Sequence, residues 1–240
     1  MKIDVVCLGV GKGSTYVLKG EPSSAFAIRF NSELKILVDC GAGIALSCLR
    51  NLNGFIPNTI YISHNHMDHT GDLPVVLSTL SQGGKKPNIL SHPDVAHLIQ
   101  QHRLHPVPID VLKQNYNWIM PDQDGVIVLG NDLSMQLVKS IHSYICYGFI
   151  LYKGVCPILG YTADTDFDYE IYSMVTKAPV AIVSGRDIGN DNHASFDEIN
   201  EFAKNVASCS VFVTHYEQSD YIFSSSNVRF LREGEVIDLA

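Results

Sequence analysis

The sequence predicts an α/β protein, an αββα sandwich in which two mixed β-sheets lie between helical layers. Three observations support this class: ten strand-like runs are present, the early ones follow one another as hairpins, and the later ones alternate with helix-like runs. The 240 residues, 46% of them hydrophobic, suffice to bury a substantial core. No repeat, linker or low-complexity segment divides the chain, so we expect a single domain over residues 1–240.

The strand-like runs are short, and several alternate apolar and polar residues or are rich in β-branched residues. In chain order they are Ile3–Leu8, Ala25–Phe30, Lys35–Val38, Thr59–Ile62, Val126–Leu129, Leu133–Ile141, Tyr147–Tyr152, Cys156–Tyr161, Val180–Val183 and Val211–Thr214.

The helix-like runs fall between these strands. They are Ile44–Leu52, Leu73–Leu80, Asp94–His102 and Phe196–Val206. In the last run the apolar residues recur at helical spacing and share one face, which predicts an amphipathic helix packed on a sheet.

Composition and charge narrow the class of function. No run of about 18 apolar residues occurs, and the N-terminus lacks the layout of a signal peptide, so we expect a cytoplasmic protein that does not span a membrane. The net charge of −8 and the lack of an extended basic patch disfavour a long nucleic acid as partner. A small anionic substrate is easier to accommodate, because bound cations would offset the acidity locally.

The six scattered cysteines are expected to be reduced and mostly buried.

The segment from Ser63 to Gly71 carries the strongest signal. It reads Ser-His-Asn-His-Met-Asp-His-Thr-Gly, so three histidines and one aspartate fall within six positions. It follows a predicted strand and precedes a helix pattern, which places it on the kind of loop where α/β folds carry their sites. The alternative is a polar loop with chance histidines, and four ligand-type residues in this order weigh against it.

The spacing within this segment is suited to metal binding. His64 and His66 are two residues apart, so extended backbone points both imidazoles the same way and lets them bind one metal. Asp68 and His69 lie where the chain turns into the helix and can face a second metal. Imidazole with carboxylate suits zinc, and also iron or manganese. We therefore expect two divalent metal ions per chain, with zinc as the first candidate.

The pattern H-x-H-x-D-H at positions 64–69 resembles the signature of the metallo-β-lactamase superfamily. Upstream, the glycine-rich turn at residues 8–14, Pro-Ser-Ser at 22–24 and Val-Asp-Cys-Gly at 38–41 look like the start of its ribonuclease Z-like branch. The resemblance covers nearly the whole chain. It implies the metallo-β-lactamase sandwich and a metal-dependent hydrolase.

Three downstream positions resemble the remaining ligands of that family. His142 ends the strand-like run Leu133–Ile141, and Asp164 lies in Thr-Ala-Asp-Thr, where the family has Thr-Gly-Asp-Thr. His215 closes the last predicted strand as part of a Thr-His pair. The resemblance implies one metal held by His64, His66 and His142, and another held by Asp68, His69 and His215, with Asp164 bridging.

His193 precedes the predicted helix Phe196–Val206 instead of following a strand. It resembles the position at which ribonuclease Z-like phosphodiesterases use a histidine to protonate the leaving oxygen. The alternative is a plain residue before a helix, with Ser195 as the N-cap and Glu198 completing a capping box.

A supporting segment of the family is missing. Its His-Glu-Ala-Thr is replaced by Ser-Gly-Arg-Asp at residues 184–187. Asp187 and Arg186 are therefore the two candidates for the role of the glutamate that orients the catalytic histidine.

The resemblance also implies a mechanism, in which Asp68 and His193 are the catalytic residues. Two metals lower the pKa of a bridging water, so that hydroxide exists at neutral pH. Asp68 orients that hydroxide, the metals stabilise the developing charge, and His193 donates a proton to the departing oxygen.

The length between two motifs bears on the substrate. Ribonuclease Z carries a long arm that grips transfer RNA between its third histidine and its bridging aspartate, whereas only 21 residues separate His142 from Asp164 here, enough for a hairpin. With the acidic charge, this favours small phosphodiesters such as cyclic nucleotides. Compact relatives of this type include cyclic-nucleotide phosphodiesterases, among them phage anti-Pycsar enzymes, and are commonly homodimers.

Three other functions stay open at this point. A metal site of this kind also suits carbonyl substrates such as a lactone, a thioester or a β-lactam. A ribonuclease Z-type endonuclease that processes transfer RNA 3′ ends is another alternative. A non-catalytic metal-binding or ligand-sensing protein is the third, and the complete ligand set weighs against it.

Overall fold

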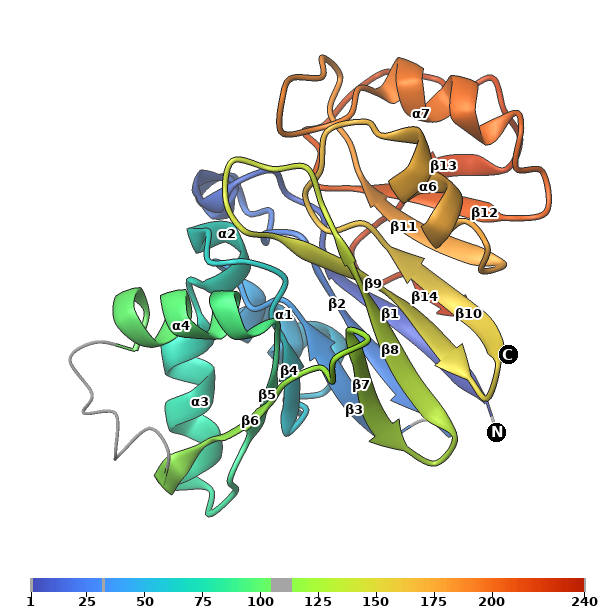
Figure 1. The fold of residues 1–240 in the computed structure, drawn as a ribbon. Coiled ribbons are helices and arrows are strands. Elements are labelled where there is room, and N and C mark those ends of the chain that lie inside the picture. Colours follow the sequence, from blue (N-terminus) through green and yellow to red (C-terminus); the bar gives the residue numbers. More distant parts are fainter. Residues whose placement is uncertain (1, 32, 105–113, 240) are drawn as a thin grey trace. The chain divides into compact units, whose positions relative to one another are not determined.

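The chain consists of two compact units, each built on one seven-stranded mixed β-sheet. This computed structural model describes residues 2–31, 33–104 and 114–239 (Figure 1). Unit 1 comprises residues 1–120 and 232–238, and unit 2 comprises residues 121–231 and 239. The prediction of an α/β protein with two mixed sheets is confirmed.

The sheet of unit 1 has the strand order β14-β1-β2-β3-β4-β5-β6. Neighbouring strands are antiparallel from β14 to β3 and parallel from β3 to β6. Its strands are β1 (Ile3–Gly9), β2 (Ala25–Phe30), β3 (Glu33–Val38), β4 (Thr59–Tyr61), β5 (Asn88–Leu90), β6 (Asn117–Ile119) and β14 (Val236–Asp238).

The helices of unit 1 connect these strands. They are η1 (Ser14–Lys19), α1 (Ile44–Asn51), α2 (Met67–Thr70), α3 (Leu73–Gln82) and α4 (Pro93–His102). All seven residues of β1 are buried, and α1 packs against that strand. Because β3 and β4 are parallel, their carboxyl ends lie at the same edge of the sheet. The residues that follow the two strands are thereby brought together.

The sheet of unit 2 has the order β13-β12-β11-β10-β9-β8-β7. Neighbouring strands are antiparallel from β7 to β10 and parallel from β10 to β13. Its elements are β7 (Val126–Gly130), β8 (Leu133–Lys139), β9 (Tyr147–Lys153), β10 (Cys156–Tyr161), α6 (Tyr169–Val175), β11 (Val180–Ser184), α7 (Phe196–Ala203), β12 (Ser210–Thr214) and β13 (Val228–Phe230).

Helices α6 and α7 pack their buried apolar side chains against this sheet and form its core with them. The apolar face of α7, with Phe196, Ile199 and Phe202, packs in one cluster with Val183 of β11 and Val213 of β12. The α7 N-terminus carries the predicted capping box, in which Ser195 and Glu198 bond each other's backbone N–H. The helix therefore begins at a fixed point, just after His193.

The structure differs from the predicted secondary structure in three respects: short strands that were missed, short helices that were missed, and one strand that ends earlier. Strands β5, β6, β13 and β14 escaped prediction, because three residues are too few for an alternating pattern. Helices η1, α2 and α6 escaped it as well, being six, four and seven residues long. Strand β8 ends at Lys139 and not at Ile141, since the Ile141 N–H donates to Thr165 Oγ1 instead of continuing the ladder with β9.

Five of the six cysteines are buried and all are free thiols, which confirms the prediction made for them. In the described ranges, no helix combines the length and the apolar character needed to cross a bilayer.

Candidate metal centre

The histidine loop of unit 1 follows strand β4 and leads into the short helix α2 (Figure 1). His66 is the N-cap of α2, and its extended backbone marks the change from strand to helix. Asp68 and His69 lie within the single turn that follows. An acidic residue in the first turn of a helix is favoured by the positive end of the helix dipole.

His64 and His66 point towards each other. The His64 Nε2 atom lies 3.0 Å from His66 Nδ1, and the ring centroids are 4.7 Å apart. Two nitrogen ligands on one tetrahedral zinc ion are separated by about 3.3 Å, given a zinc–nitrogen distance of about 2.0–2.1 Å. The pair therefore has the spacing that a shared metal requires.

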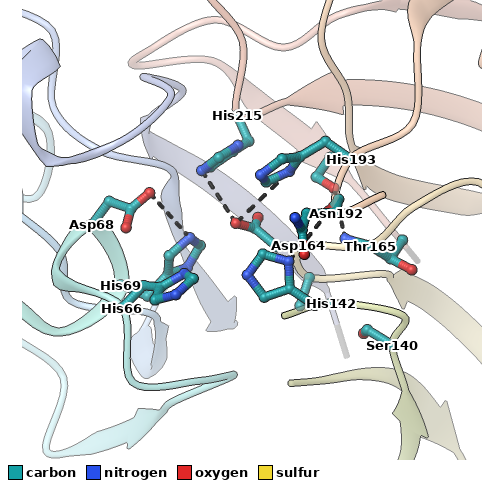
Figure 2. Close-up of polar contacts among 12 residues, drawn as sticks. His66, Asp68, His69, Ser140, His142, Asp164, Thr165, Asn192, His193 and His215 are labelled. Atoms are coloured by element: carbon teal, nitrogen blue, oxygen red, sulfur yellow. Dashed lines mark hydrogen bonds and ion pairs between the residues drawn. The ribbon is translucent and has the colours of Figure 1, made fainter. Parts of the chain in front are cut away.

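His69 and Asp68 form the second ligand pair of the loop. His69 is fully buried, and its Nε2 lies 3.8 Å from Asp68 Oδ2 (Figure 2). Gly41 allows α2 to approach this closely, because a Cβ at that position would lie 1.7 Å from the Asp68 carbonyl oxygen. Both side chains could therefore face one metal position, and the assignment of Asp68 and His69 to one metal stays a prediction.

Asp39 is a residue whose part in this site the sequence reasoning missed. It follows β3, is completely buried, and accepts hydrogen bonds from the Ser63 N–H at 2.8 Å and from His69 Nδ1 at 2.9 Å. The Ser63 hydroxyl lies 2.8 Å from Asp39 Oδ2 and 3.0 Å from His64 Nδ1. The only signal in the sequence was the Val-Asp-Cys-Gly segment, whose contact with the histidine loop depends on the pairing of β3 with β4.

Asp39 sets the tautomers of two histidines. Its carboxylate only accepts hydrogen bonds, so His69 must carry its proton on Nδ1, which leaves the Nε2 lone pair for a metal. The Ser63 hydroxyl has one proton and gives it to Asp39. Its oxygen then accepts the Nδ1 proton of His64, so that Nε2 of that ring also carries the lone pair that a metal requires.

Asp164 is the centre of the corresponding set in unit 2. It follows β10, is 2% exposed, and its Oδ2 lies 3.3 Å from His215 Nε2 (Figure 2). That distance again suits two ligands on one metal. A buried carboxylate requires a compensating charge or hydrogen bonds. Ala163 and His215 both have left-handed backbone, with φ of 53° and 60°, which is uncommon for residues other than glycine and clusters at functional sites.

His142 lies on the loop between β8 and β9, three residues beyond the end of the strand. Its Nδ1 lies 3.3 Å from the Asn192 carbonyl oxygen, and the Ser143 N–H donates to Asn192 Oδ1 at 2.6 Å. Asn192 thus connects this loop to the loop that bears His193. Its role could not be predicted from the sequence, because no local pattern links residues 49 positions apart. Because Nδ1 donates to a carbonyl, it carries the ring proton of His142, and Nε2 carries the lone pair that a metal would require.

His193 packs among the predicted ligands of unit 2. Its ring stacks on His215 at 4.9 Å, meets His142 edge-on at 5.4 Å, and its Nδ1 lies 4.0 Å from Asp164 Oδ2. Burial lowers the pKa of the His193 imidazole to about 3, and the Asp164 carboxylate opposes that shift only in part. In the metal-free chain His193 is therefore neutral.

Each unit thus gathers the predicted residues that lie within it. Unit 1 brings together His64, His66, Asp68 and His69, and unit 2 brings together His142, Asp164, His193 and His215. Imidazole and carboxylate donors at these spacings fit divalent metals such as zinc. The candidates for the role of the missing glutamate, Asp187 and Arg186, stay predictions.

The chain is similar in sequence to ribonuclease Z. Ribonuclease Z of Clostridium perfringens is 27% identical over 161 residues, which are 61% of this chain and 50% of that protein. The chain thus matches half the length of this curated relative.

Solved structures with the metallo-β-lactamase fold are similar over the whole chain. The metallo-β-lactamase fold protein YhfI from Bacillus subtilis has a TM-score of 0.79 at 20% identity, covering 99% of this chain and 100% of that one. The short form of human tRNase Z has a TM-score of 0.71 at 17% identity, covering 99% of both chains. The predicted metallo-β-lactamase fold is confirmed. At the level of families, the one described as "Anti-Pycsar protein Apyc1" matches residues 3–237.

Proposed function

The chain belongs to the anti-Pycsar protein Apyc1 family, and we propose that it is a dinuclear metal-dependent hydrolase of small phosphodiesters such as cyclic nucleotides. The first metal would be held by His64, His66 and His142. The second would be held by Asp68, His69 and His215, with Asp164 bridging the two. Units 1 and 2 would then be halves of a single domain over residues 1–240, which unfolding of the chain in one cooperative transition would support.

The observation that carries the proposal is the hydrogen bonding of the histidine rings. In His64, His69 and His142 the Nδ1 atom is engaged, by Ser63, Asp39 and Asn192 respectively. In each ring this leaves Nε2 as the atom with a lone pair. Metal-binding histidines are held in this way, by an outer partner that fixes the tautomer and the ring orientation.

Two bound divalent cations would supply Lewis acidity, lowering the pKa of water and polarising a phosphoryl oxygen. The chain's own residues supply position and protons. The Asp68 carboxylate, 13% exposed on α2, would orient the attacking water as well as bind a metal. His193 would donate a proton to the departing oxygen. A phosphate anion beside His193 raises the pKa of its imidazole, and this is the direction that a general acid requires.

Two features support a small substrate over transfer RNA. The stretch between His142 and Asp164 consists of the β9–β10 hairpin and its flanking residues, as its length predicted. The net charge of −8 disfavours a long polyanion. Zinc is the metal we expect, and manganese or iron would fit the same donors.

The protein's assembly and location stay predictions. We expect a cytoplasmic homodimer, on the resemblance to compact phosphodiesterases. Light scattering on the purified protein should give twice the mass of one 26.5 kDa chain, and a monomer at all concentrations would exclude the dimer.

A substrate panel on metal-loaded protein tests the function. We expect about two equivalents of metal per chain by elemental analysis, and turnover of cyclic nucleotides and of bis(p-nitrophenyl) phosphate. Lactones and a transfer RNA precursor should be poor substrates. Turnover of lactones alone would favour the carbonyl-hydrolase alternative, and cleavage of the precursor would favour a ribonuclease Z-type endonuclease. A reconstituted protein that holds no metal would overturn the proposal altogether.

A further inference from the structure

We propose that Arg103 is a positioning residue that holds the backbone of the histidine loop in its metal-binding form. The inference concerns the metal centre and in that respect rests on the proposed function. Arg103 is the C-cap of α4 in unit 1, more than 30 residues after the loop. It belongs to none of the motifs that the sequence analysis singled out.

The guanidinium group of Arg103 bonds the loop at two points. Its Nη2 donates to the Asn65 carbonyl oxygen at 2.7 Å, and its Nε donates to Thr70 Oγ1 at 2.7 Å. The Thr70 hydroxyl in turn donates to the His66 carbonyl oxygen at 2.7 Å. One side chain therefore fixes two consecutive carbonyls, those of Asn65 and His66.

These carbonyls determine where the ligand side chains point. The peptide between Asn65 and His66 is one of the two peptides that link His64 to His66, whose ring nitrogens lie 3.0 Å apart. The His66 carbonyl also accepts the His69 N–H at 3.1 Å, the bond that closes the turn carrying Asp68 and His69. A rotation of either peptide would therefore move ligands of both predicted metals.

Burial and charge make these bonds strong. Asn65 is 6% exposed and Thr70 is fully buried, so water competes little for the carbonyl and the hydroxyl. Hydrogen bonds from a charged donor are stronger than neutral ones, and the planar fork of arginine reaches two acceptors at once. Lysine, a point charge on a flexible stem, would satisfy one acceptor at a time.

The test compares metal affinity among matched variants. Zinc affinity, measured against a chromophoric chelator, should fall about 10–100-fold in Arg103→Met, the range typical for loss of an outer partner of metal ligands. Arg103→Lys should lie between this variant and the wild type. Thr70→Val, which keeps the shape and removes the hydroxyl, should also weaken binding, whereas Thr70→Ser should restore it. The double variant Arg103→Met/Thr70→Val should lose less than the product of the single losses, because the two residues share a bond.

A second measurement needs no metal. Amide hydrogen exchange of the loop peptides in the metal-free protein should quicken in Arg103→Met and Thr70→Val, since the bonds that hold the loop closed are lost. Arg50→Met is the matched control, because Arg50 forms an exposed ion pair with Glu233 elsewhere in unit 1. It should change neither measurement.

Wild-type metal affinity and wild-type loop exchange in Arg103→Met would overturn the inference. Faster exchange confined to α4 would overturn it too, since it would mean that Arg103 serves only its own helix. If the wild-type protein binds no metal, the proposed function fails, and the exchange measurement alone decides the role of Arg103.

Discussion

Replacement of Asp39 by asparagine should weaken metal binding while leaving the fold intact. The substitution keeps the size and shape of the side chain at a position that is completely buried. Its oxygen can still accept from the Ser63 N–H and hydroxyl. Its NH₂ group, however, then faces His69 Nδ1, where the carboxylate accepted a proton at 2.9 Å.

The magnitude follows from the tautomer of His69. In the metal-free variant the imidazole moves its proton to Nε2, the atom that faces the Asp68 carboxylate at 3.8 Å, so that Nδ1 can accept a hydrogen bond from the amide. Binding a metal at Nε2 then requires the proton on Nδ1, where it meets the amide N–H. An unsatisfied buried donor costs about 1–3 kcal/mol. Every 1.4 kcal/mol is a factor of ten, so the affinity should fall roughly 5–150-fold.

The assay is zinc titration against a chelator together with thermal unfolding of the metal-free protein. The free energy of unfolding of the metal-free variant should stay within about 2 kcal/mol of the wild type, because its hydrogen bonds are rearranged and not lost. Asp168→Asn is the matched control, since Asp168 caps α6 through the Ile171 N–H and asparagine caps equally well. Two equivalents of zinc bound to Asp39→Asn with wild-type affinity would refute the reasoning.

Three further predictions follow from the site and the core. Asp68→Ala should abolish turnover without unfolding the protein, as checked by circular dichroism, because one carboxylate binds metal and orients water; near-normal rates would remove it from the mechanism. In His193→Ala the turnover rate should fall roughly 10²–10⁴-fold on a substrate with a poor leaving group such as a ribose hydroxyl, and far less on a nitrophenyl diester, with unchanged metal content. Equal losses of rate on both substrates would point to a role of His193 in positioning. Loss of one metal would mean that His193 takes the ligand place given to His215. A thiol reagent at pH 8 should label only the exposed Cys156 in the native protein and all six cysteines in denaturant, because burial raises the pKa of thiols such as Cys48 to about 12 and blocks access; rapid labelling of several native thiols would contradict the core described here.

The local parts of the site could be predicted from the sequence. A strand, a loop with H-x-H-x-D-H and a helix follow one another within about a dozen residues, and short-range periodicity is enough to order them. The helix after His193 begins at its capping box, which Ser195 and Glu198, three positions apart, specify. The strands that precede Asp164 and His215 also end where their apolar runs end.

Only the tertiary structure decided which residues support the ligands. Asp39 reaches His69 because β3 and β4 are parallel neighbours in register, Arg103 reaches Asn65 from the end of α4, and Asn192 reaches Ser143 across two loops. The short strand β14 pairs with β1 at the opposite end of the chain. These contacts join groups from about 30 to more than 200 residues apart. Their partners are selected by sheet register and helix packing, which depend on the whole core and leave no periodic trace in the segments themselves.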